Sequence, residues 1–176
     1  MQEEKEMGGI GLAIKPEYPD GDRDTLFEEA LEFQDFVVDL FLKEIGISIS
    51  NYSSKYFQYN KGENPQGIEI KLDNRILETK NVSIEVAEKS RADIQNWTPS
   101  GIMRDDNTWL YVQGNKKIIF IFAKKTLQGI YKARYQDKVW EPKKTIKTFL
   151  MPMSDAEKYA AKVIRVNKQE DPDVPF

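Results

Sequence analysis

The sequence of 176 residues contains no cysteine and no histidine. Without cysteine, it can form neither a disulfide framework nor a zinc site built on thiolates. Without histidine, it lacks the commonest general base, the commonest zinc ligand and the usual partner of a serine or cysteine nucleophile. A metal ion in this chain would therefore be a hard cation held by carboxylates and carbonyls, which favours Mg²⁺, Mn²⁺ or Ca²⁺.

Long apolar segments are also absent from the sequence. It contains no run of about 18 or more apolar residues, so we expect no membrane-spanning helix. Residues 1–6 are mostly charged and are not followed by the apolar stretch that a secretory signal needs. These absences predict a cytoplasmic protein without a membrane partner.

The composition is nevertheless that of a chain with a hydrophobic core. Hydrophobic residues make up 40% of the sequence and aromatic residues 11%, and a chain of this length most often folds as one domain. We expect residues 23–166 to form that domain. Glycine and proline interrupt residues 1–22, which predicts an extended polar lead, and residues 167–176 read as a disordered tail.

Charge is distributed unevenly along the chain. Residues 1–44 contain thirteen acids and four bases, a net charge of −9, whereas residues 115–147 contain ten bases and two acids, a net charge of +8. A basic block can attract nucleic acid even when the whole protein is acidic, although it can also be a solvated lysine-rich surface. The candidate nucleic-acid-binding residues are Lys116, Lys117, Lys124, Lys125 and, for stacking on a base, Trp97.

The other two tryptophans differ in their surroundings. Trp109 lies in an apolar run and is predicted to pack in the core. Trp140 lies in a polar segment, as Trp97 does, and is therefore a further candidate for stacking on a base.

Hydrophobic patterns predict the order of the secondary-structure elements. A helix is expected from Asp24 or Thr25 to about Glu44, with Gly46 as its stop. The predicted strands are 47–50, 67–73, 82–88, 109–112 and 118–122. Two later helices are predicted at 124–135 and 154–166, the second opened by a capping box at Ser154, and 136–149 is read as irregular with a strand at 145–150 left open.

This order predicts an α/β or α+β domain with a mixed central β-sheet flanked by helices. Only a short loop separates residues 67–73 from residues 82–88. We therefore expect these two strands to pair as an antiparallel hairpin.

Two acids and a lysine come together at the first of these strands. Glu63 stands shortly before it, and the alternation of a strand places Glu69, Lys71 and Asp73 on the face opposite its apolar residues. Two carboxylates beside a lysine can hold a divalent cation and position a water against a phosphodiester. The expected hairpin would also bring Glu85 to roughly 5 Å from Glu69. The alternative is that these charges are the wet face of the strand and form weak surface pairs.

The pattern of an acid, a short gap and Glu-x-Lys resembles the active-site signature of the PD-(D/E)XK, or restriction-endonuclease-like, nuclease superfamily. The resemblance extends over about residues 55–112 and is to a branch found in phage-type and restriction-like proteins. The segments that carry it are Gly62-Glu63, Gly67 to Asp73, Glu78 to Asn81, Ile84-Glu85, Pro99 to Ile102 and Asp106 to Trp109.

This resemblance implies a restriction-endonuclease-like core and hydrolysis of DNA, by endo- or exonucleolytic cleavage, with Mg²⁺ or Mn²⁺ as the cofactor. It assigns Glu63 and Glu69 as the first and second metal-binding acids. It assigns Lys71 as the catalytic lysine, and Glu85 as an extra acid that is either a further metal ligand or a structural partner. Two departures are that Glu63 stands where aspartate is commoner and Lys80 where glycine is usual.

Alternatives remain open at this point. A second alignment takes Glu85 and Lys89 as the glutamate and lysine of the motif, with Asp73 or Glu69 as the first acid. The alternative function is a non-catalytic nucleic-acid-binding or phage accessory protein on the same fold. A third is an interaction domain whose acids are only surface residues. Members of the superfamily often act as dimers, so a homodimer is compatible with the resemblance.

Overall fold

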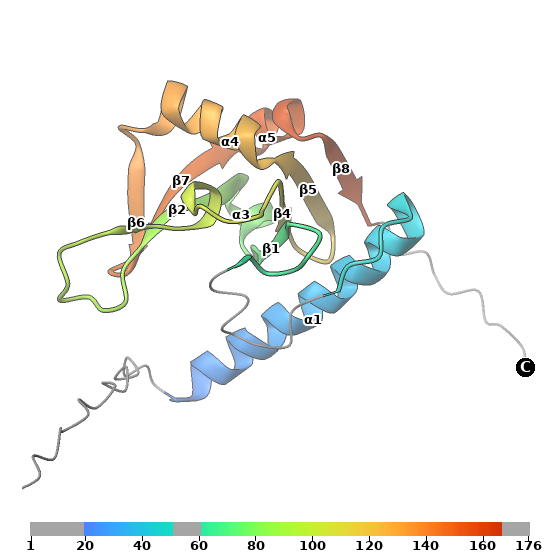
Figure 1. Cartoon of the computed structure of the whole chain (residues 1–176), viewed down its shortest axis with the longest axis horizontal. Coiled ribbons are helices and arrows are strands. Elements are labelled where there is room, and N and C mark those ends of the chain that lie inside the picture. Colours follow the sequence, from blue (N-terminus) through green and yellow to red (C-terminus); the bar gives the residue numbers. More distant parts are fainter. Residues whose placement is uncertain (1–19, 51–60, 167–176) are drawn as a thin grey trace, which may run out of the picture.

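The computed structural model of the protein describes residues 20–50 and 61–166 (Figure 1). The predicted disordered tail of 167–176 lies outside the described residues, as does nearly all of the predicted extended lead. Residues 20–22, the end of that lead, already belong to the first helix.

The described helices are α1 (Asp20–Ile45), α3 (Ile76–Thr79), α4 (Lys124–Ile130) and α5 (Met153–Tyr159), with a 3₁₀ turn, η1 (Gly101–Met103), and a π-helical turn, η2 (Tyr131–Tyr135). The described strands are β1 (Ile68–Leu72), β2 (Asn81–Glu88), β3 (Thr98–Pro99), β4 (Leu110–Gly114), β5 (Ile118–Ala123), β6 (Val139–Lys143), β7 (Ile146–Pro152) and β8 (Lys162–Arg165). The mixed helix-and-strand class predicted from the sequence is therefore confirmed.

The strands form two sheets rather than one central sheet. Sheet A has the order β1-β4-β5-β8, in which β1 and β4 are parallel and the other pairs are antiparallel. Sheet B has the order β3-β2-β7-β6 and is antiparallel throughout. Sheet A is thus the mixed sheet of the prediction, and sheet B is an additional layer.

The predicted hairpin between β1 and β2 is wrong. β1 pairs with β4, whereas β2 pairs with β3 and β7 in the other sheet. The short helix α3, which was predicted as part of a loop, lies between β1 and β2 and carries a buried Ile76. Because α3 contributes to the core, the chain turns out of sheet A there instead of folding back as a hairpin.

Helix α1 covers one face of sheet A, on the side of the molecule opposite to α4 and α5 (Figure 1). Its buried side chains are Phe33, Val37 and Phe41, spaced four residues apart and therefore on one face of the helix. Leu31 and Leu42, on the same helix, are exposed. Full burial of each apolar side chain contributes about 1.5–3 kcal/mol, so this face holds the helix on the sheet.

The two faces of sheet A support two separate cores. The α1 core joins the helix to one face of the sheet and includes Phe33, Val37, Phe41, Ile68, Ile70, Val112 and Ile121. The inter-sheet core fills the other face and includes Ile84, Val86, Tyr111, Phe120, Phe122, Leu127 and Phe149. Strand β1 is therefore covered on both sides.

The C-terminal third departs from the prediction in several places. The strand predicted at 145–150 is confirmed as part of β7, and its partner β6 occupies residues read as irregular. Helix α5 ends at Tyr159, and β8 then pairs with β5. The predicted capping box is wrong, because the residue that caps α5 is Pro152 and it makes no side-chain cap hydrogen bond. Residues 47–50 form no strand.

No helix in the described ranges is long and apolar enough to cross a membrane.

A buried ion pair joins α4 to the loop before β4. The Nζ atom of Lys124 lies 2.7 Å from Oδ1 of Asp106 and also donates to the carbonyl of Arg104 at 2.7 Å. Burial raises the pKa of Asp106, but its hydrogen bonds from Lys124 and Thr108 outweigh that effect and hold this pKa below its usual value. The Lys124 side chain is only 5% exposed and its ammonium is bonded within the protein, a position that does not favour contact with nucleic acid.

We predict that Asp106→Asn destabilises the protein by about 3–5 kcal/mol, because it leaves the ammonium of Lys124 buried without a counter-charge. The free energy of unfolding in urea measures this cost. Glu32→Gln is the matched control, since it breaks the exposed pair with Lys116 and should cost less than about 1 kcal/mol. Equal costs for the two variants would contradict a buried role for the Asp106 pair.

Candidate functional site

The carboxylate of Glu69 is buried inside the protein. Strand alternation points the apolar residues of β1 into the α1 core and points Glu69 and Lys71 toward sheet B. Glu69 stands beside Tyr111 of β4 and is only 1% exposed. Its Oε1 atom accepts from the ammonium of Lys71, whereas its Oε2 atom makes no hydrogen bond within the described residues. This face of β1 is therefore not the wet face of a surface strand.

Lys71 joins the two acids of the motif. Its Nζ atom lies 3.1 Å from Oε1 of Glu69 and 3.7 Å from Oε1 of Glu63. Burial lowers the pKa of Lys71, but the neighbouring carboxylates of Glu69, Glu63 and Glu85 outweigh this effect and hold the pKa above its usual value. Lys71 is therefore cationic at neutral pH, and its 30% exposed side chain links the buried acid to solvent.

The loop that carries Glu63 is fixed by a buried asparagine. The side chain of Asn64 donates to the carbonyl of Ile68 at 2.6 Å and accepts from the N–H of the same residue at 2.9 Å. The Asn107 side chain in turn donates to the Asn64 carbonyl at 2.8 Å. These bonds make the connection between Glu63 and β1 tight, so the acid lies within ion-pair distance of Lys71.

Gly67 allows this loop to approach the segment before β4. It has φ +68°, and a Cβ atom there would lie 2.4 Å from the carbonyl oxygen of Asn107. Its carbonyl accepts from the N–H groups of Trp109 at 2.8 Å and Leu110 at 3.2 Å. Only glycine combines this positive φ with this close approach.

Burial and electrostatics also disfavour a charge on Glu63. Burial raises the pKa of Glu63 and the negative charge of Glu69 adds to this effect, while Lys71, the N–H of Ile70 and Arg104 lower it. The net result is a pKa above its ordinary value of 4.5. A further cation at this centre would favour the ionised form.

Glu85 contributes from sheet B. The hydroxyl of Ser100 donates to Oε1 of Glu85, and a Cβ atom on Gly101 would lie 2.4 Å from the Glu85 carbonyl oxygen. The Ser-Gly pair of the sequence motif is thus the segment that packs on this acid. Glu85 acts electrostatically on Lys71 across the gap between the sheets. It is not the cross-strand neighbour of Glu69 that the expected hairpin required.

Two residues at this centre were missed from the sequence. Tyr111 is 1% exposed, and its pKa is raised well above 10.0, first by burial and then by the charges of Glu69 and Glu85. Arg104 lies near Glu63, whose pKa it lowers, and its Nη2 atom is 3.6 Å from Glu88. The apolar pattern of β4 concealed Tyr111, and no local motif marks Arg104.

The second alignment of the motif loses support. Lys89 donates to the carbonyl of Ala92 at 3.1 Å and lies over the ring of Trp97, away from an acid pair. Asp73 accepts from the N–H groups of Ser83 and Arg75, which makes it a link between the end of β1 and the start of β2. Glu63, Glu69 and Lys71 are the residues that the fold brings together.

The acids fit a divalent cation in part. No group of three or more Asp or Glu side chains converges in metal-binding geometry within residues 20–50 and 61–166. Mg²⁺ often needs only one or two carboxylates, with waters and substrate phosphates as its other ligands. Glu69, with one oxygen free of hydrogen bonds, and Glu63 beside it can provide that number.

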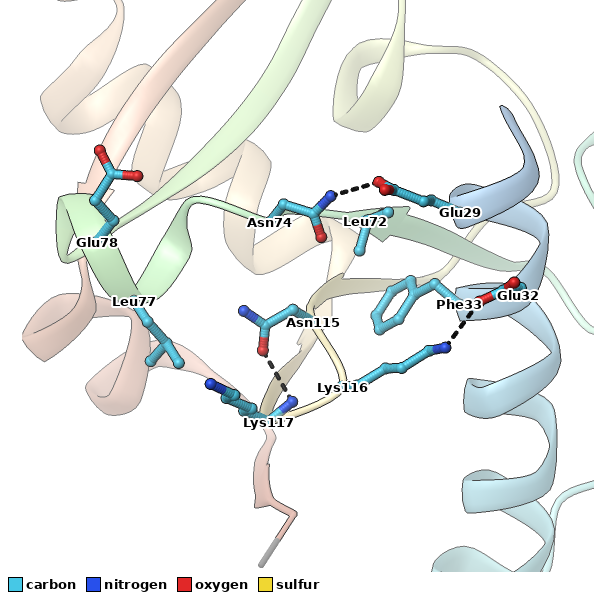
Figure 2. A pocket seen from close by; sticks show the side chains of 10 residues that line it. All are labelled: Glu29, Glu32, Phe33, Leu72, Asn74, Leu77, Glu78, Asn115, Lys116 and Lys117. Carbon is cyan, nitrogen blue, oxygen red and sulfur yellow. Dashed lines mark hydrogen bonds and ion pairs between the residues drawn. The ribbon is translucent and has the colours of Figure 1, made fainter. Parts of the chain in front are cut away.

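The expected nucleic-acid-binding lysines do not form one surface. Lys116 is exposed but pairs with Glu32 at 3.0 Å. Both residues line a cavity of about 650 Å³, and Lys117 lines it as well. Figure 2 shows that α1 and the turn between β4 and β5 face each other across this cavity. The acids in its lining are Glu29, Glu32 and Glu78. This cavity is therefore not a basic groove.

The remaining candidates lie elsewhere. Lys125 is exposed at the start of α4. Trp97 lines a second cavity, of about 450 Å³, and Trp140 is 49% exposed on β6. Trp109 is 56% exposed, so its predicted core packing is wrong; its indole N–H donates to the Gln66 carbonyl at 2.6 Å and fastens the Glu63 loop. Neither cavity is lined by the acids of the motif.

Comparison with known proteins adds no relative. No family model matches the chain, and neither the curated proteins nor the solved structures give a significant match. The resemblance to the nuclease superfamily therefore rests on the motif residues themselves.

We predict that Gly67→Ala destabilises the protein by about 1–3 kcal/mol, because alanine is strained at this φ and would meet the Asn107 carbonyl. Gly129→Ala is the matched control. Gly129 lies in α4 with nothing near its missing Cβ, so the change should stabilise by about 0.5–1 kcal/mol. Urea unfolding of both variants tests the prediction, and a stabilised Gly67→Ala variant would refute it.

We predict that Glu63→Gln stabilises the protein in the absence of metal ions by about 0.5–2 kcal/mol at neutral pH, because it removes a buried negative charge next to Glu69. Because the folded-state pKa of Glu63 is raised, its contribution to stability is fully present below 4.5 and is lost as pH rises through the folded pKa. The stability difference between variant and wild type should therefore be small below pH 4.5 and should grow toward neutrality. Urea unfolding across pH measures it, and a pH-independent difference would contradict the role of the charge.

Proposed function

We propose that this protein is a metal-dependent nuclease that hydrolyses DNA phosphodiester bonds. The observation that carries the proposal is the buried carboxylate of Glu69, which has one oxygen without a hydrogen bond and has a lysine and a second acid beside it. A buried ionisable group left in this state usually costs stability, so it is more often found where a function requires it. A structural core would place an apolar residue there.

The residues divide into roles that follow from their positions. Glu69 and Glu63 would hold Mg²⁺ or Mn²⁺, which when bound polarises a phosphate and lowers the pKa of a coordinated water. Lys71, held cationic by its neighbours, would orient the attacking water and stabilise charge on the phosphate. Glu85 would act from sheet B as an additional acid, positioned by Ser100.

The proposal extends to the fold of the protein. We take α1 and sheet A as the counterpart of a restriction-endonuclease-like core. Support comes from the parallel pair of β1 and β4, which carries Glu69 and Lys71 on one face and packs against α1 with the other.

A second candidate function is a non-catalytic nucleic-acid-binding or accessory protein. The favouring observation is that Lys71 already lies between Glu63 and Glu69, so part of their charge is compensated without a metal ion. Such a protein would bind DNA but would neither bind Mg²⁺ at these acids nor cleave.

The deciding experiment incubates the full chain with supercoiled, linear, single-stranded and branched DNA in Mg²⁺ or Mn²⁺. We predict metal-dependent cleavage, reduced about 10²- to 10³-fold by Lys71→Ala, the loss expected when an electrostatic stabiliser of the transition state is removed. Lys43→Ala is the matched control, since this lysine is exposed in the last turn of α1 and is not among the candidate DNA-binding residues.

Metal binding is measured separately by the shift in melting temperature with Mn²⁺. Wild type should be stabilised and Glu69→Gln should not, while circular dichroism verifies that the variant is folded. Cleavage that survives in both Lys71→Ala and Glu69→Gln would overturn the assignment. Binding of DNA with no cleavage and no Mn²⁺ shift would favour the accessory protein.

A further inference from the structure

The cavity of about 450 Å³ lies at one end of sheet B and is mainly apolar and aromatic. Val86, Pro99 and Met103 form part of its wall, with Tyr131 from the π-helical turn and Trp97 from the preceding loop. Flat apolar walls of this kind suit a flat aromatic ligand. The charged side chains beside the cavity decide which aromatic ligand it would accept.

Two lysines accompany the tryptophan. The Nζ atom of Lys147 lies 4.3 Å from the centroid of the Trp97 ring, and that of Lys89 lies 4.7 Å from it. Lys147 also faces one acid, Glu141, at 3.7 Å, but that side chain is 51% exposed, so the pair is weak. Lys147 lines the cavity and Lys89 lies over the same ring, so positive charge accompanies the apolar walls. A base that stacks on Trp97 would take the place of these ammonium groups over the ring.

The sheet places Lys147 at this cavity. On β7, alternation puts Lys147 on the face that also carries the buried Phe149 and Met151. The register of β2 shifts between Glu85 and Ala87, which is the irregularity of a bulge, and Ala87 is thereby paired with Lys147. Lys147 lines the cavity from this face of β7, and its side chain stays 30% exposed.

One short segment connects this cavity to the candidate active site. Pro99 and Met103 line the cavity, whereas Ser100, between them, donates to Glu85. Arg104 follows directly and lies close enough to Glu63 to lower its pKa. A strand of nucleic acid placed at the acids would therefore have the cavity beside it.

We propose that this cavity binds one unpaired base of a single-stranded DNA segment, which stacks on Trp97 while Lys89 and Lys147 contact the adjoining phosphates. Base–aromatic stacking joined to a basic edge is the general means by which proteins hold single strands. The inference rests on the proposed function for its choice of DNA, and it adds that the substrate carries unpaired nucleotides.

Duplex DNA fits this cavity less well. In a duplex the faces of each base are covered by its neighbours, so a base must leave the stack before it can meet an indole ring, which costs a few kcal/mol. Lys89 and Lys147 would contact the phosphates of both duplex and single-stranded DNA, but Trp97 would stack only on a base of the single strand. The two contributions are therefore separable by mutation.

The experiment measures fluorescence anisotropy of a labelled 12-nucleotide oligothymidine and of a matching duplex, with the full chain in EDTA so that nothing is cleaved. We expect tighter binding of the single strand, weakened about tenfold or more by Trp97→Ala, the typical loss for one stacked base. Trp97→Phe should retain most of the affinity, and duplex binding should change little. Trp140→Ala, which removes an exposed tryptophan outside the cavity, is the matched control.

Salt dependence tests the lysines. Lys147→Gln should reduce the slope of the logarithm of affinity against that of salt concentration by about 1, because one phosphate contact is lost. Equal effects of Trp97→Ala and Trp140→Ala, or a preference for duplex, would overturn the proposal. Circular dichroism and Trp97→Phe together exclude unfolding as the cause of a loss.

The binding measurements test the base site separately from the nuclease activity. Glu69→Gln should abolish cleavage and leave the binding of the single strand intact. If wild type binds the single strand through Trp97 but does not cleave, the nuclease proposal fails and the base site stands. If cleavage requires Lys71 but Trp97→Ala leaves single-strand binding unchanged, the base site fails and the nuclease stands.

Discussion

The surroundings of strand β1 are arranged around one constraint, the burial of the Glu69 carboxylate. Strand β1 is covered on its apolar face by α1 and on its charged face by the inter-sheet core, so the carboxylate has little access to water. A buried carboxylate is tolerated only when its charge is paired with a nearby cation. Lys71 provides that cation from two residues away, on the same face of the strand.

Several elements position the groups around this acid. The Asn64 side chain, Gly67 and the indole of Trp109 hold the Glu63 loop against the segment before β4. On the other side, Ser100 and Gly101 pack on Glu85. Segments up to about forty residues apart in the chain therefore meet at one centre. Except for Asn64, these residues belong to the segments that carry the resemblance.

The sequence predicted local features better than pairings. The acids and lysine of β1 share a face because alternation is a property of one strand, and the helix stop at Gly46 is likewise local. The β1–β2 hairpin failed because pairing depends on which partners bury the most apolar surface, and Ile76 on α3 decided it. The exposure of Trp109 and the burial of Lys124 could not be predicted for a similar reason. Each depends on a residue that is distant in the sequence, which is Gln66 for Trp109 and Asp106 for Lys124.

The excess of negative charge at this centre is the strongest argument that it holds a bound cation in addition to Lys71. Glu63, Glu69 and Glu85 act on a single Lys71, and the nearest further base, Arg104, is paired with Glu88. Burial is the main cause of the raised pKa of Glu63, and the charge of Glu69 adds to it. A divalent ion would offset the excess of negative charge and lower the pKa of Glu63. A protein selected only for stability would remove the same strain more simply, by replacing Glu63 or Glu69 with a neutral residue.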